Sequence, residues 1–588
     1  ANDQRSTAGS LYQYSPVLLA GEGITWRKIY GHDGVQVNSE TGKVSWDIDF
    51  TLPSESFYIG VEAKNDLGST QDTWIVTIGD GQVRYVGKDD GMLTIKEAFE
   101  FAASGDTVVI TDGTYGGYPY TLDSNGGAGG FALPPNGSAE KYTTVMAQTP
   151  GEVVFNDRIY LAGKRGDIHH LAYKGMVGTK GVMTSSGSGD TDRPHHLKFI
   201  LMGATSGSFR LMNSDYILVE SSYSFGSSRY KFISYKSNNV ILRRTVSRYD
   251  LPPLSGQNSP IASYSIYSSN NVAVQNAIDI DSDALDFYPH GSNIEYGGAF
   301  YVPTTAGASK NVAFIRSIAL NGRMNFAGYD NTNGTAEVIF EDVIGWDIEI
   351  PADEMVHDLT HGHGQADFNH VTIGDIKYQQ RPSYLFNGYN YHVDNFTNTL
   401  FYNLIQEEDA ASVYLFRDVE KLSFNNYFNS GEQHTGEIRA QYLYGTPNLP
   451  DNYEYDYGSF TYIDPMVNAL RYITRIEANS DLSGIASDNG DIGANVESLV
   501  GKSGTLYGEN GWNIDDGVSM WPFPAEGLIK RKMAAFSYTG PNYLANEGTL
   551  SGSRGFAAEG EGLYGGPITL TSYIWEYLGH ACPQNICL

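Results

Sequence analysis

Short segments in which apolar and polar residues alternate recur along most of the chain. Six of them share one register, at residues 216–220, 240–246, 272–278, 312–318, 338–344 and 422–428. The first five start 24, 32, 40 and 26 residues apart, which fits a coil of about 24 residues with variable insertions better than a propeller, whose period would stay near 40. Because side chains alternate across a strand, the apolar positions should point into the coil. The pattern predicts an all-β chain built on a right-handed parallel β-helix.

Polar residues in the middle of these segments mark an expected bend. Asn276 and Asn426 occupy that position, and Asn side chains readily hydrogen-bond to nearby backbone. A second strand is expected to precede each segment, as at residues 231–235, 264–267 and 414–417.

Both ends of the solenoid have recognisable signals. Apolar residues at helical spacing over 93–102 precede a strand at 107–110, and this predicts a helical plug, because the first coil has no neighbour to cover it. At the other end, residues 491–494 resemble the closing segment of such solenoids, and residues 570–578 are expected to be helical and to cap or brace the solenoid.

The first eighty residues predict a separate module. Strand-like runs at 43–48, 57–63 and 73–78 are separated by turn-forming residues, which is typical of a small β-sandwich. This stretch resembles the Ig-like, cadherin-like modules that bacteria attach to secreted carbohydrate-active enzymes. The resemblance implies a spacer or docking role, and a passive structural module is the alternative. We therefore expect a sandwich over 1–80, a solenoid carrying catalysis over 81–495 and a C-terminal capping region over 496–588.

Composition narrows the class of protein further. The 588 residues include 67 Gly and 42 Tyr with 18% charged residues, which excludes a disordered chain, a coiled coil and collagen. The net charge of −30 argues against binding nucleic acid or an anionic membrane through the overall field, and no apolar run is long enough to span a membrane. Cys582 and Cys587 could close a short disulfide loop in an oxidising compartment. We expect a monomeric bacterial protein that is secreted, periplasmic or on the cell surface.

Charge is unevenly distributed in this acidic chain. Residues 158–248 contain fourteen Lys and Arg against five Asp and Glu, together with four histidines. Stacked coils lie about 4.8 Å apart and would bring these residues onto one wall. Such a basic strip predicts a track for an anionic polysaccharide; scattered solvated charges are the alternative.

The densest part of the strip and the coils after it supply the candidate catalytic centre. In β-elimination of a uronic-acid polymer, a cation neutralises the carboxylate and a Lys, His or Tyr removes the C5 proton. Lys231 is our candidate base, its pKa lowered by the adjacent Arg229, and Tyr264 is the acid or the alternate base. The predicted catalytic residues are Arg229, Lys231, Arg248, Tyr264 and His290. The predicted substrate-binding residues are Lys236, Arg243, Tyr249, Tyr267 and Arg323.

Acidic residues after the segment at 272–278 allow a second chemistry. Asp250 and the group Asp279, Asp281 and Asp283 could act as the paired carboxyl groups of a glycoside hydrolase. The last three could instead bind Ca²⁺ in a lyase or form a solvated turn. A secreted polysaccharide lyase acting on an acidic, uronic-acid-containing polysaccharide is the first hypothesis. A β-helix glycoside hydrolase on an anionic or sulfated glycan is the second, and a non-catalytic carbohydrate-binding protein or adhesin is the third.

Two short stretches resemble known β-helix enzymes. The sequence ISYKSNNV at 233–240 resembles the Lys-Ser strand of the alginate lyase and chondroitinase B family of polysaccharide lyases. The resemblance implies that Lys236 is the base and that an Arg one coil later assists it, but residues 261–267 contain no Arg, so Lys236 is a second candidate. The sequence HGHG at 361–364 resembles a polygalacturonase element without its paired aspartate motifs, and we expect a turn there.

Overall fold

The computed structural model describes most of the chain, and strands dominate the described part. It covers residues 4–18, 20–123, 133–162, 168–185, 193–226, 228–250, 261–282, 297–303, 306–323, 336–350, 360–361, 364–378, 384–387, 393–404, 414–417, 421–428, 440–441, 460–461, 463–464, 471–539, 549–577 and 581–587.

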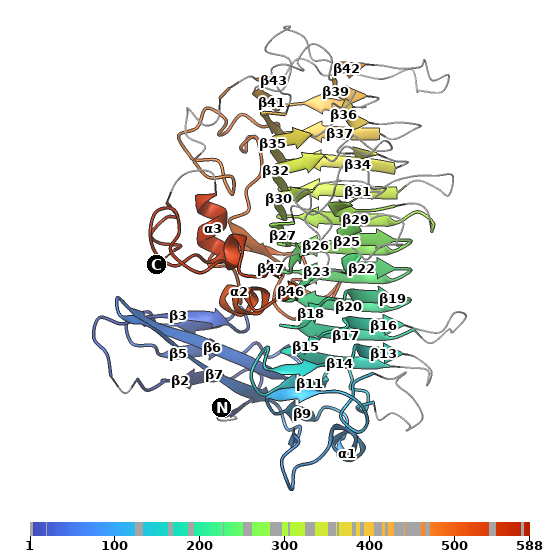
Figure 1. Cartoon of the computed structure of the whole chain (residues 1–588), viewed down its shortest axis with the longest axis vertical. Coiled ribbons are helices and arrows are strands. Elements are labelled where there is room, and N and C mark those ends of the chain that lie inside the picture. Colours follow the sequence, from blue (N-terminus) through green and yellow to red (C-terminus); the bar gives the residue numbers. More distant parts are fainter. Residues whose placement is uncertain are drawn as a thin grey trace.

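Parallel strands stack along the long axis of the molecule and form the long sheets of a β-helix (Figure 1). The first sheet has thirteen strands: β8 (Val83–Val86), β9 (Thr107–Ile110), β11 (Thr143–Ala147), β14 (His169–Lys174), β17 (His195–Ile200), β20 (Asp215–Glu220), β23 (Asn238–Arg243), β26 (Asn270–Gln275), β29 (Lys310–Ile315), β31 (Ala336–Glu341), β34 (Gly364–Asn369), β37 (Val393–Thr397) and β40 (Lys421–Ser423). The second also has thirteen: β10 (Gly113–Tyr115), β12 (Val153–Phe155), β15 (Met176–Gly178), β18 (Gly203–Thr205), β21 (Tyr223–Gly226), β24 (Val246–Tyr249), β27 (Ile278–Ile280), β30 (Ile318–Arg323), β32 (Ile344–Ile350), β35 (Thr372–Tyr378), β38 (Leu400–Tyr402), β41 (Asn425–Phe428) and β43 (Phe460–Thr461).

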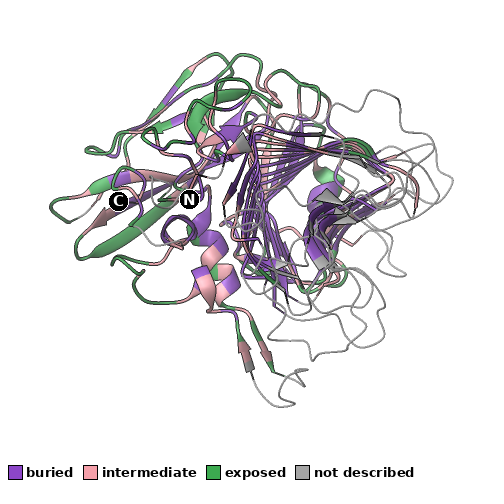
Figure 2. Ribbon diagram, turned by 90° about the horizontal axis from the view of Figure 1, so that it is seen from above, coloured by how far each residue is buried: buried purple, intermediate pink, exposed green. Residues whose placement is uncertain are grey.

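A third sheet closes the coil. In the early coils it has six strands: β13 (Ile159–Ala162), β16 (Val182–Ser185), β19 (Phe209–Met212), β22 (Tyr230–Tyr235), β25 (Ile261–Tyr267) and β28 (Gly297–Tyr301). A four-stranded sheet takes this place in the later coils: β33 (Thr360–His361), β36 (Tyr384–Asn387), β39 (Tyr414–Arg417) and β42 (Ala440–Gln441). Seen along the axis, the sheets surround a buried interior (Figure 2). The predicted parallel β-helix is confirmed.

The predicted register is confirmed for four of the six segments. The segment at 216–220 is shifted by one residue, since Ile217 pairs with Val240, and the segment at 422–428 is shifted by two, since Leu422 continues the row of Phe340, Phe368 and Phe396. Val240 pairs with Val272, Val272 with Val312, and Val312 with Val338, and all four side chains are buried inside the coil. Aromatic rings form further interior ladders, as where Phe314 and Phe340 stack 5.1 Å apart. These ladders exist because each strand places its alternate side chains inward at the same height in every coil.

The polar middle positions lie at the bend between the first and second sheets. Arg244 and Asn276 have φ of 53° and 50°, so each expected long strand divides into two. The Asn276 amide donates to Ser498 O at 3.0 Å and accepts from Val500 N at 2.7 Å. The expected bend and backbone bonds are confirmed for Asn276, whose bonded backbone belongs to the C-terminal segment. Asn426 also bonds to backbone, at Ile463 O and Ile463 N, but it lies within β41, and the bend there is at Phe424, whose φ is 54°.

The first coil has its helical plug. Helix α1 (Ile95–Phe101) begins at Thr94, whose hydroxyl accepts from Glu97 N in a capping box. Ile95, Ala98 and Phe99 are buried against the interior of the first coils, as the helical spacing predicts.

The N-terminal residues form the predicted small β-sandwich. One sheet contains β1 (Gln4–Ser6), β3 (Thr25–Tyr30), β6 (Ser56–Asn65) and β7 (Gly68–Ile78), and the other contains β2 (Leu11–Tyr14), β4 (Val35–Val37) and β5 (Val44–Asp47). Between them lies a core that includes Trp46 and Trp74. The sandwich packs beside the early coils (Figure 1), where the buried Glu55 carboxylate contacts Lys174 at 2.5 Å and Lys198 at 3.2 Å.

The C-terminal segment runs along the flank of the solenoid, beside its middle coils (Figure 1). Its elements are β44 (Ser498–Val500), β45 (Asp515–Ser519), α2 (Glu526–Ala534), β46 (Ser537–Thr539), β47 (Thr549–Ser551), the 3₁₀ turn η3 (Gly555–Ala557) and α3 (Leu570–Glu576). Trp521 and Trp575 pack with Ile278, Ile318 and other outward-facing residues of the second sheet. The expected C-terminal helix is confirmed, and it braces the solenoid from the side.

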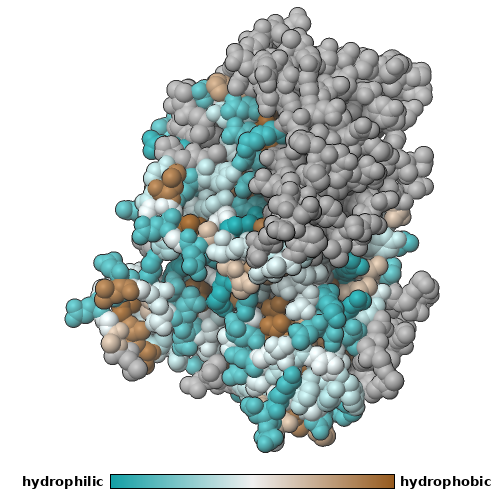
Figure 3. All heavy atoms as spheres, in the orientation of Figure 1, coloured by the Kyte–Doolittle hydropathy of each residue, from teal (hydrophilic) through white to brown (hydrophobic). Residues whose placement is uncertain are grey.

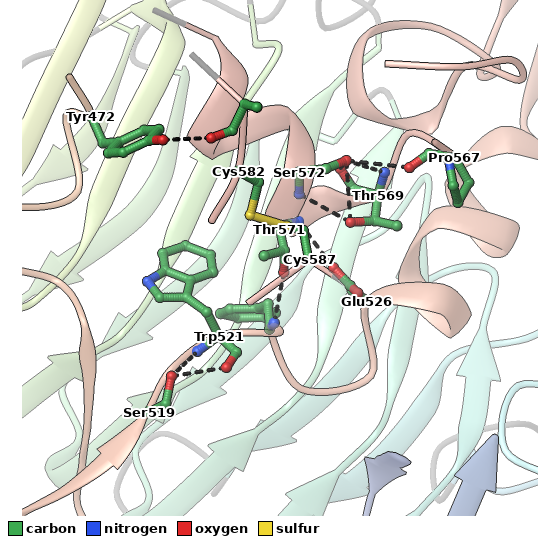
Figure 4. Close-up of a disulfide and its surroundings, with 12 residues drawn as sticks. Tyr472, Ser519, Trp521, Glu526, Pro567, Thr569, Thr571, Ser572, Cys582 and Cys587 are labelled. Atoms are coloured by element: carbon green, nitrogen blue, oxygen red, sulfur yellow. Dashed lines mark hydrogen bonds between the residues drawn. A yellow bond between two sulfur atoms is a disulfide. The ribbon is translucent and has the colours of Figure 1, made fainter. Parts of the chain in front are cut away.

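The expected disulfide between Cys582 and Cys587 is present and follows α3 (Figure 4). Nearby, the Glu526 carboxylate accepts from Thr571 N at 2.9 Å, which joins α2 to α3. In the described part of the chain, no helix is long and apolar enough to cross a membrane. The described surface in Figure 3 is mainly hydrophilic, with small separate hydrophobic patches.

Candidate functional site

The outer face of the third sheet carries a set of aromatic and basic side chains. Neighbouring strands place Tyr160 beside Met183, Met183 beside Arg210, and Arg210 beside Ile233. Three cations lie close to tyrosine rings, with centroid distances of 5.7 Å for Arg158 on Tyr160, 4.8 Å for Arg229 on Tyr230 and 5.3 Å for Lys236 on Tyr235. We call this the aromatic–basic face; its members are Arg158, Tyr160, Met183, Arg210, Arg229, Tyr230, Ile233, Tyr235, Lys236 and Tyr267.

Only part of the predicted basic strip contributes to this face. Arg158, Arg210 and Lys236 are exposed and Arg229 is half-buried. The remaining described cations include six that are buried: Lys174, Lys198, Lys231, Arg243, Arg244 and Arg248. The prediction of one continuous track is therefore wrong, because the sandwich and the C-terminal segment pack on the solenoid and cover five of the twelve described cations, and Lys231 is buried within the solenoid itself.

Arg243 illustrates why the prediction failed. It points away from the coil interior as expected, beside Gln275, whose Oε1 accepts from Arg243 Nε at 2.9 Å. The C-terminal segment covers it, and the guanidinium donates to Lys502 O at 2.5 Å and Trp512 O at 2.7 Å. With no exposed surface, Arg243 holds this segment in place and does not face a substrate.

Arg248 and Tyr264 are also buried away from solvent. The guanidinium of Arg248 contacts Asp250 at 2.9 Å and donates to Met533 O at 3.2 Å, so it ties β24 to α2. Tyr264 points into the coil and stacks 5.1 Å from Phe232, while its hydroxyl donates to Thr245 O at 3.0 Å. Neither residue is placed to touch a polysaccharide, and the catalytic roles predicted for them are corrected to structural ones.

Lys231 lies at the start of β22, at the edge of the aromatic–basic face. Its ammonium donates to Gly226 O and to Ser228 O, the latter at 3.3 Å, and sits 4.1 Å from the centroid of the Tyr249 ring. Burial lowers the pKa of Lys231 to about 7, although Asp250 and Asp279 oppose the shift. The lowered pKa that we expected is therefore present, but its main cause is desolvation and the repelling cation is Arg248.

A buried carboxyl group lies close to this lysine. Oδ1 of Asp279 accepts hydrogen bonds from the hydroxyl groups of Ser247 at 2.8 Å, Ser263 at 2.7 Å and Ser282 at 2.8 Å. Burial raises the pKa of Asp279 to about 6 in spite of these bonds. Asp250 Oδ2 accepts from Gly226 N at 2.9 Å, and both carboxylates interact electrostatically with the Lys231 ammonium. We call Lys231, Tyr249, Asp250 and Asp279 the Lys231 cluster.

The Lys231 cluster contains two groups, Lys231 and Asp279, whose pKa values lie near neutral pH. An amine with a pKa near 7 is partly neutral there and can accept a proton, and a carboxyl group with a pKa near 6 can donate one. Lys231 and Asp279 are both buried, and the lysine contacts the half-buried Ser228, the sequence neighbour of Arg229 of the aromatic–basic face.

The remaining predicted residues fall into three groups. Tyr249 and Tyr267 are each 8% exposed. The Tyr249 hydroxyl donates to Arg229 O at 2.7 Å, and the Tyr267 hydroxyl lies 2.7 Å from that of Tyr230. Lys236 is exposed. Arg323 lies at the end of β30, but its side chain, like all of Asp283 and His290, falls outside the described residues.

The acids proposed as calcium ligands already have other partners. Asp281 accepts from Asn321 Nδ2 at 3.0 Å, Phe556 N at 2.9 Å and Tyr573 Oη at 2.9 Å, whereas Asp279 is held by serines. Within the described ranges, no group of three or more His, Cys, Asp or Glu is arranged to hold a metal ion. Asp281 thus has structural partners in the C-terminal segment, and the third predicted ligand, Asp283, lies outside the described residues.

Sequence reasoning missed the serines that hold Asp279. Ser247 and Ser263 come from different coils and Ser282 from the turn after β27, and nothing in their local sequence distinguishes them from other serines in strands and turns. The register of β24 against β27 pairs Ser247 with Asp279, and Ser263 on β25 and Ser282 after β27 reach the same carboxylate.

The fold defines the chain as a parallel β-helix protein with a lateral sandwich. No known protein family and no curated protein matches its sequence. Among solved structures, similarity is found to a rhamnogalacturonan lyase (12% identity, 56% of this chain and 83% of that one, TM-score 0.29). An alginate lyase from Paenibacillus sp. is similar at 10% identity over 53% of this chain and 94% of that one, with a TM-score of 0.24. A putative alpha-galactosidase from Bacteroides fragilis has 10% identity and a TM-score of 0.12; the match covers 29% of this chain and 43% of that one.

Proposed function

We propose that this protein binds an acidic, uronic-acid-containing polysaccharide on the aromatic–basic face and cleaves it by β-elimination, with Lys231 as the base. The observation that carries the proposal is a lysine with a pKa lowered to about 7 at the edge of that face. Exposed Arg and Lys beside tyrosine rings suit a polymer of charged sugars, because the cations attract carboxylates and the rings offer flat apolar surface. The disulfide supports a protein that works outside a reducing cytosol, and we propose that it is secreted and acts as a monomer.

The proposed reaction assigns each group one task. Arg229 pairs with the sugar carboxylate, which lowers the pKa of the C5 proton. Neutral Lys231 takes that proton, the C5–H electron pair forms the C4–C5 double bond, and the C4–O bond breaks. Water protonates the departing oxygen, and the lysine returns its proton to solvent.

The burial of Lys231 adds a requirement to the proposal. Its ammonium contacts the carbonyl and hydroxyl oxygens of Ser228, both at 3.3 Å. The substrate must displace the Ser228–Arg229 backbone by enough to replace these contacts. Long hydrogen bonds of this kind are weak and cost little to exchange.

Glycoside hydrolysis is a second candidate, and it is favoured by one observation. The pKa of Asp279 is raised to about 6, which suits a general acid, and Asp250 is an available second carboxylate. In this case the positive charge of Lys231 would serve only to offset the negative charge of the two carboxylates.

A panel of anionic polysaccharides tests the proposal. A lyase produces unsaturated ends that absorb ultraviolet light, a hydrolase produces reducing ends without that absorbance, and a binding protein produces neither. Lys231→Ala should abolish the absorbance, whereas Lys43→Ala, at an exposed lysine of the sandwich, should keep it. Absorbance that persists in folded Lys231→Ala would contradict the assignment.

A further inference from the structure

A large cavity lies where the sandwich, the solenoid and the C-terminal segment meet. It has a volume of about 730 Å³. Its walls come from the β3 end of the sandwich at residues 26–33, from the bends of the solenoid around Leu201 and Arg244, and from residues 518–531 of the C-terminal segment. A cavity of this size accommodates a small organic ligand, such as a short oligosaccharide.

The wall has both aromatic and charged side chains. Its aromatic members include Trp26, Tyr30, Phe57, Trp521 and Phe523. Four of its cations have a carboxylate partner within 4 Å: Arg27, Lys174, Arg244 and Arg531. Most of the charge on the wall is therefore neutralised by pairs that hold the three parts together.

Lys28 differs from these four cations. Among the described residues it has no carboxylate within salt-bridge distance, and its ammonium donates only to His32 O at 3.3 Å and Asp33 O at 3.4 Å. Burial lowers the pKa of Lys28; the charge of Asp33 opposes this shift, and that of Arg244 adds to it. An ammonium in this position would gain from an anionic partner, because its present acceptors are uncharged and distant.

A second donor on the same wall is incompletely used. The Arg244 guanidinium is 2% exposed, and its two terminal nitrogens bind Asp33, Ser503 and Gly501 O. Its Nε is buried and has no hydrogen-bond partner among the described residues. A buried donor without a partner costs free energy, and a ligand oxygen would remove that cost.

We propose that this cavity binds a short acidic sugar, whose carboxylate pairs with Lys28 and accepts from Arg244 Nε and whose rings lie against the aromatic wall. The carboxylate follows from the two donors, and the extended, partly apolar body follows from the cavity volume and its tyrosine, phenylalanine and tryptophan lining. The choice of a uronide rests on the proposed function, since such sugars are the products of that reaction. The site is separate from the Lys231 cluster, as no residue of that cluster lines the cavity.

Calorimetric titration tests the proposal with three probes: a trigalacturonate, the uncharged galactose trisaccharide and inorganic phosphate. We expect the trigalacturonate to bind the Lys231→Ala protein, and Lys28→Gln to weaken that binding by about ten-fold or more. Lys43→Gln, at an exposed lysine of the same sandwich, should leave it unchanged. Equal binding of the neutral trisaccharide, equal binding of phosphate, no binding, or no effect of Lys28→Gln would each overturn the proposal.

A measurement on the unaltered protein protects the test against misfolding of the variant. Acetylation at neutral pH, followed by mass spectrometry of peptides, reports the access and basicity of each lysine. The trigalacturonate should slow modification of Lys28 and not of Lys43; equal rates with and without it would count against the site. Turnover of polysaccharide is measured separately, so loss of the cavity site and loss of the proposed reaction give different results.

Discussion

Asp33 of the sandwich and Arg244 of the solenoid form a two-point ion pair. Nη1 lies 2.8 Å from Oδ1 and Nη2 lies 3.1 Å from Oδ2. The same guanidinium donates to Gly501 O and faces Glu220 at 3.5 Å. One buried arginine therefore joins three parts of the chain that are far apart in sequence.

Asp33→Asn should destabilise the protein substantially. Removing one partner of a buried pair leaves the other charge uncompensated, which costs about 3 to 5 kcal/mol, and we expect the lower end because Glu220 remains near Arg244. Urea unfolding measures the change, with Asp66→Asn on the exposed sandwich surface as the control. Equal midpoints for the two variants would show that the pair contributes nothing to docking.

Tyr264→Phe separates a structural role from a catalytic one. The hydroxyl contacts Thr245 in the coil interior, so its loss should cost about 1 kcal/mol of stability and leave turnover unchanged. The melting temperature and the rate of product formation check the two parts. A large fall in turnover with normal stability would restore the catalytic role first predicted for Tyr264.

The solenoid could be predicted because each coil repeats the same local pattern. Val240 and Val272 share one register, and Asn276 marks a bend, before any long-range contact is known. The candidate site could be predicted only in part. Lys231 was found from its place in a basic run, but Arg243 was misplaced, because the peptide that covers it begins about 260 residues later in the chain.

The activity of the proposed lyase should rise with pH through about 7. The base must be neutral to accept the C5 proton, and the pKa of Lys231 is about 7, so activity is lost as pH falls below that value. A hydrolase that uses protonated Asp279, whose pKa is about 6, would behave in the opposite way and lose activity as pH rises. The pH dependence of kcat/KM distinguishes them, and Lys236→Ala should keep the wild-type midpoint.

Four histidines on β14 and β17 form a ladder that should make the protein sensitive to acid. The rings of His170 and His196 stack with centroids 4.6 Å apart. Nδ1 of His170 lies 2.9 Å from Nδ1 of His169, and Nδ1 of His196 lies 2.7 Å from Nδ1 of His195. Burial and repulsion from the other histidines and Lys198 lower the pKa of His170 and of His196 to about 4. The Tyr142 ring packs against His170 and the Tyr216 ring against His196, at the two ends of the His170–His196 stack.

The sign of the effect follows from proton uptake. Between about pH 6.5 and 4 the unfolded chain binds protons that the folded ladder does not, so stability falls as pH falls through this window. In His170→Asn/His196→Asn, melting temperature should decline less steeply between pH 7 and pH 4. Asn suits both positions, where φ is 53°, because it tolerates the left-handed region. An unchanged slope would show that other groups set the acid sensitivity.

Binding of a polyuronate should weaken with salt, and Arg210 should account for part of that dependence. Arg210 is exposed near the middle of the aromatic–basic face, where Met183 and Ile233 are its strand neighbours. The screening length falls from about 10 Å at 0.1 M salt to about 3 Å at 1 M, so attraction between exposed charges is largely lost. Arg210→Ala should lower affinity at low salt and flatten the salt dependence, whereas Lys43→Ala on the sandwich should change neither. Affinity that is the same at both salt concentrations would place the polymer elsewhere on the molecule.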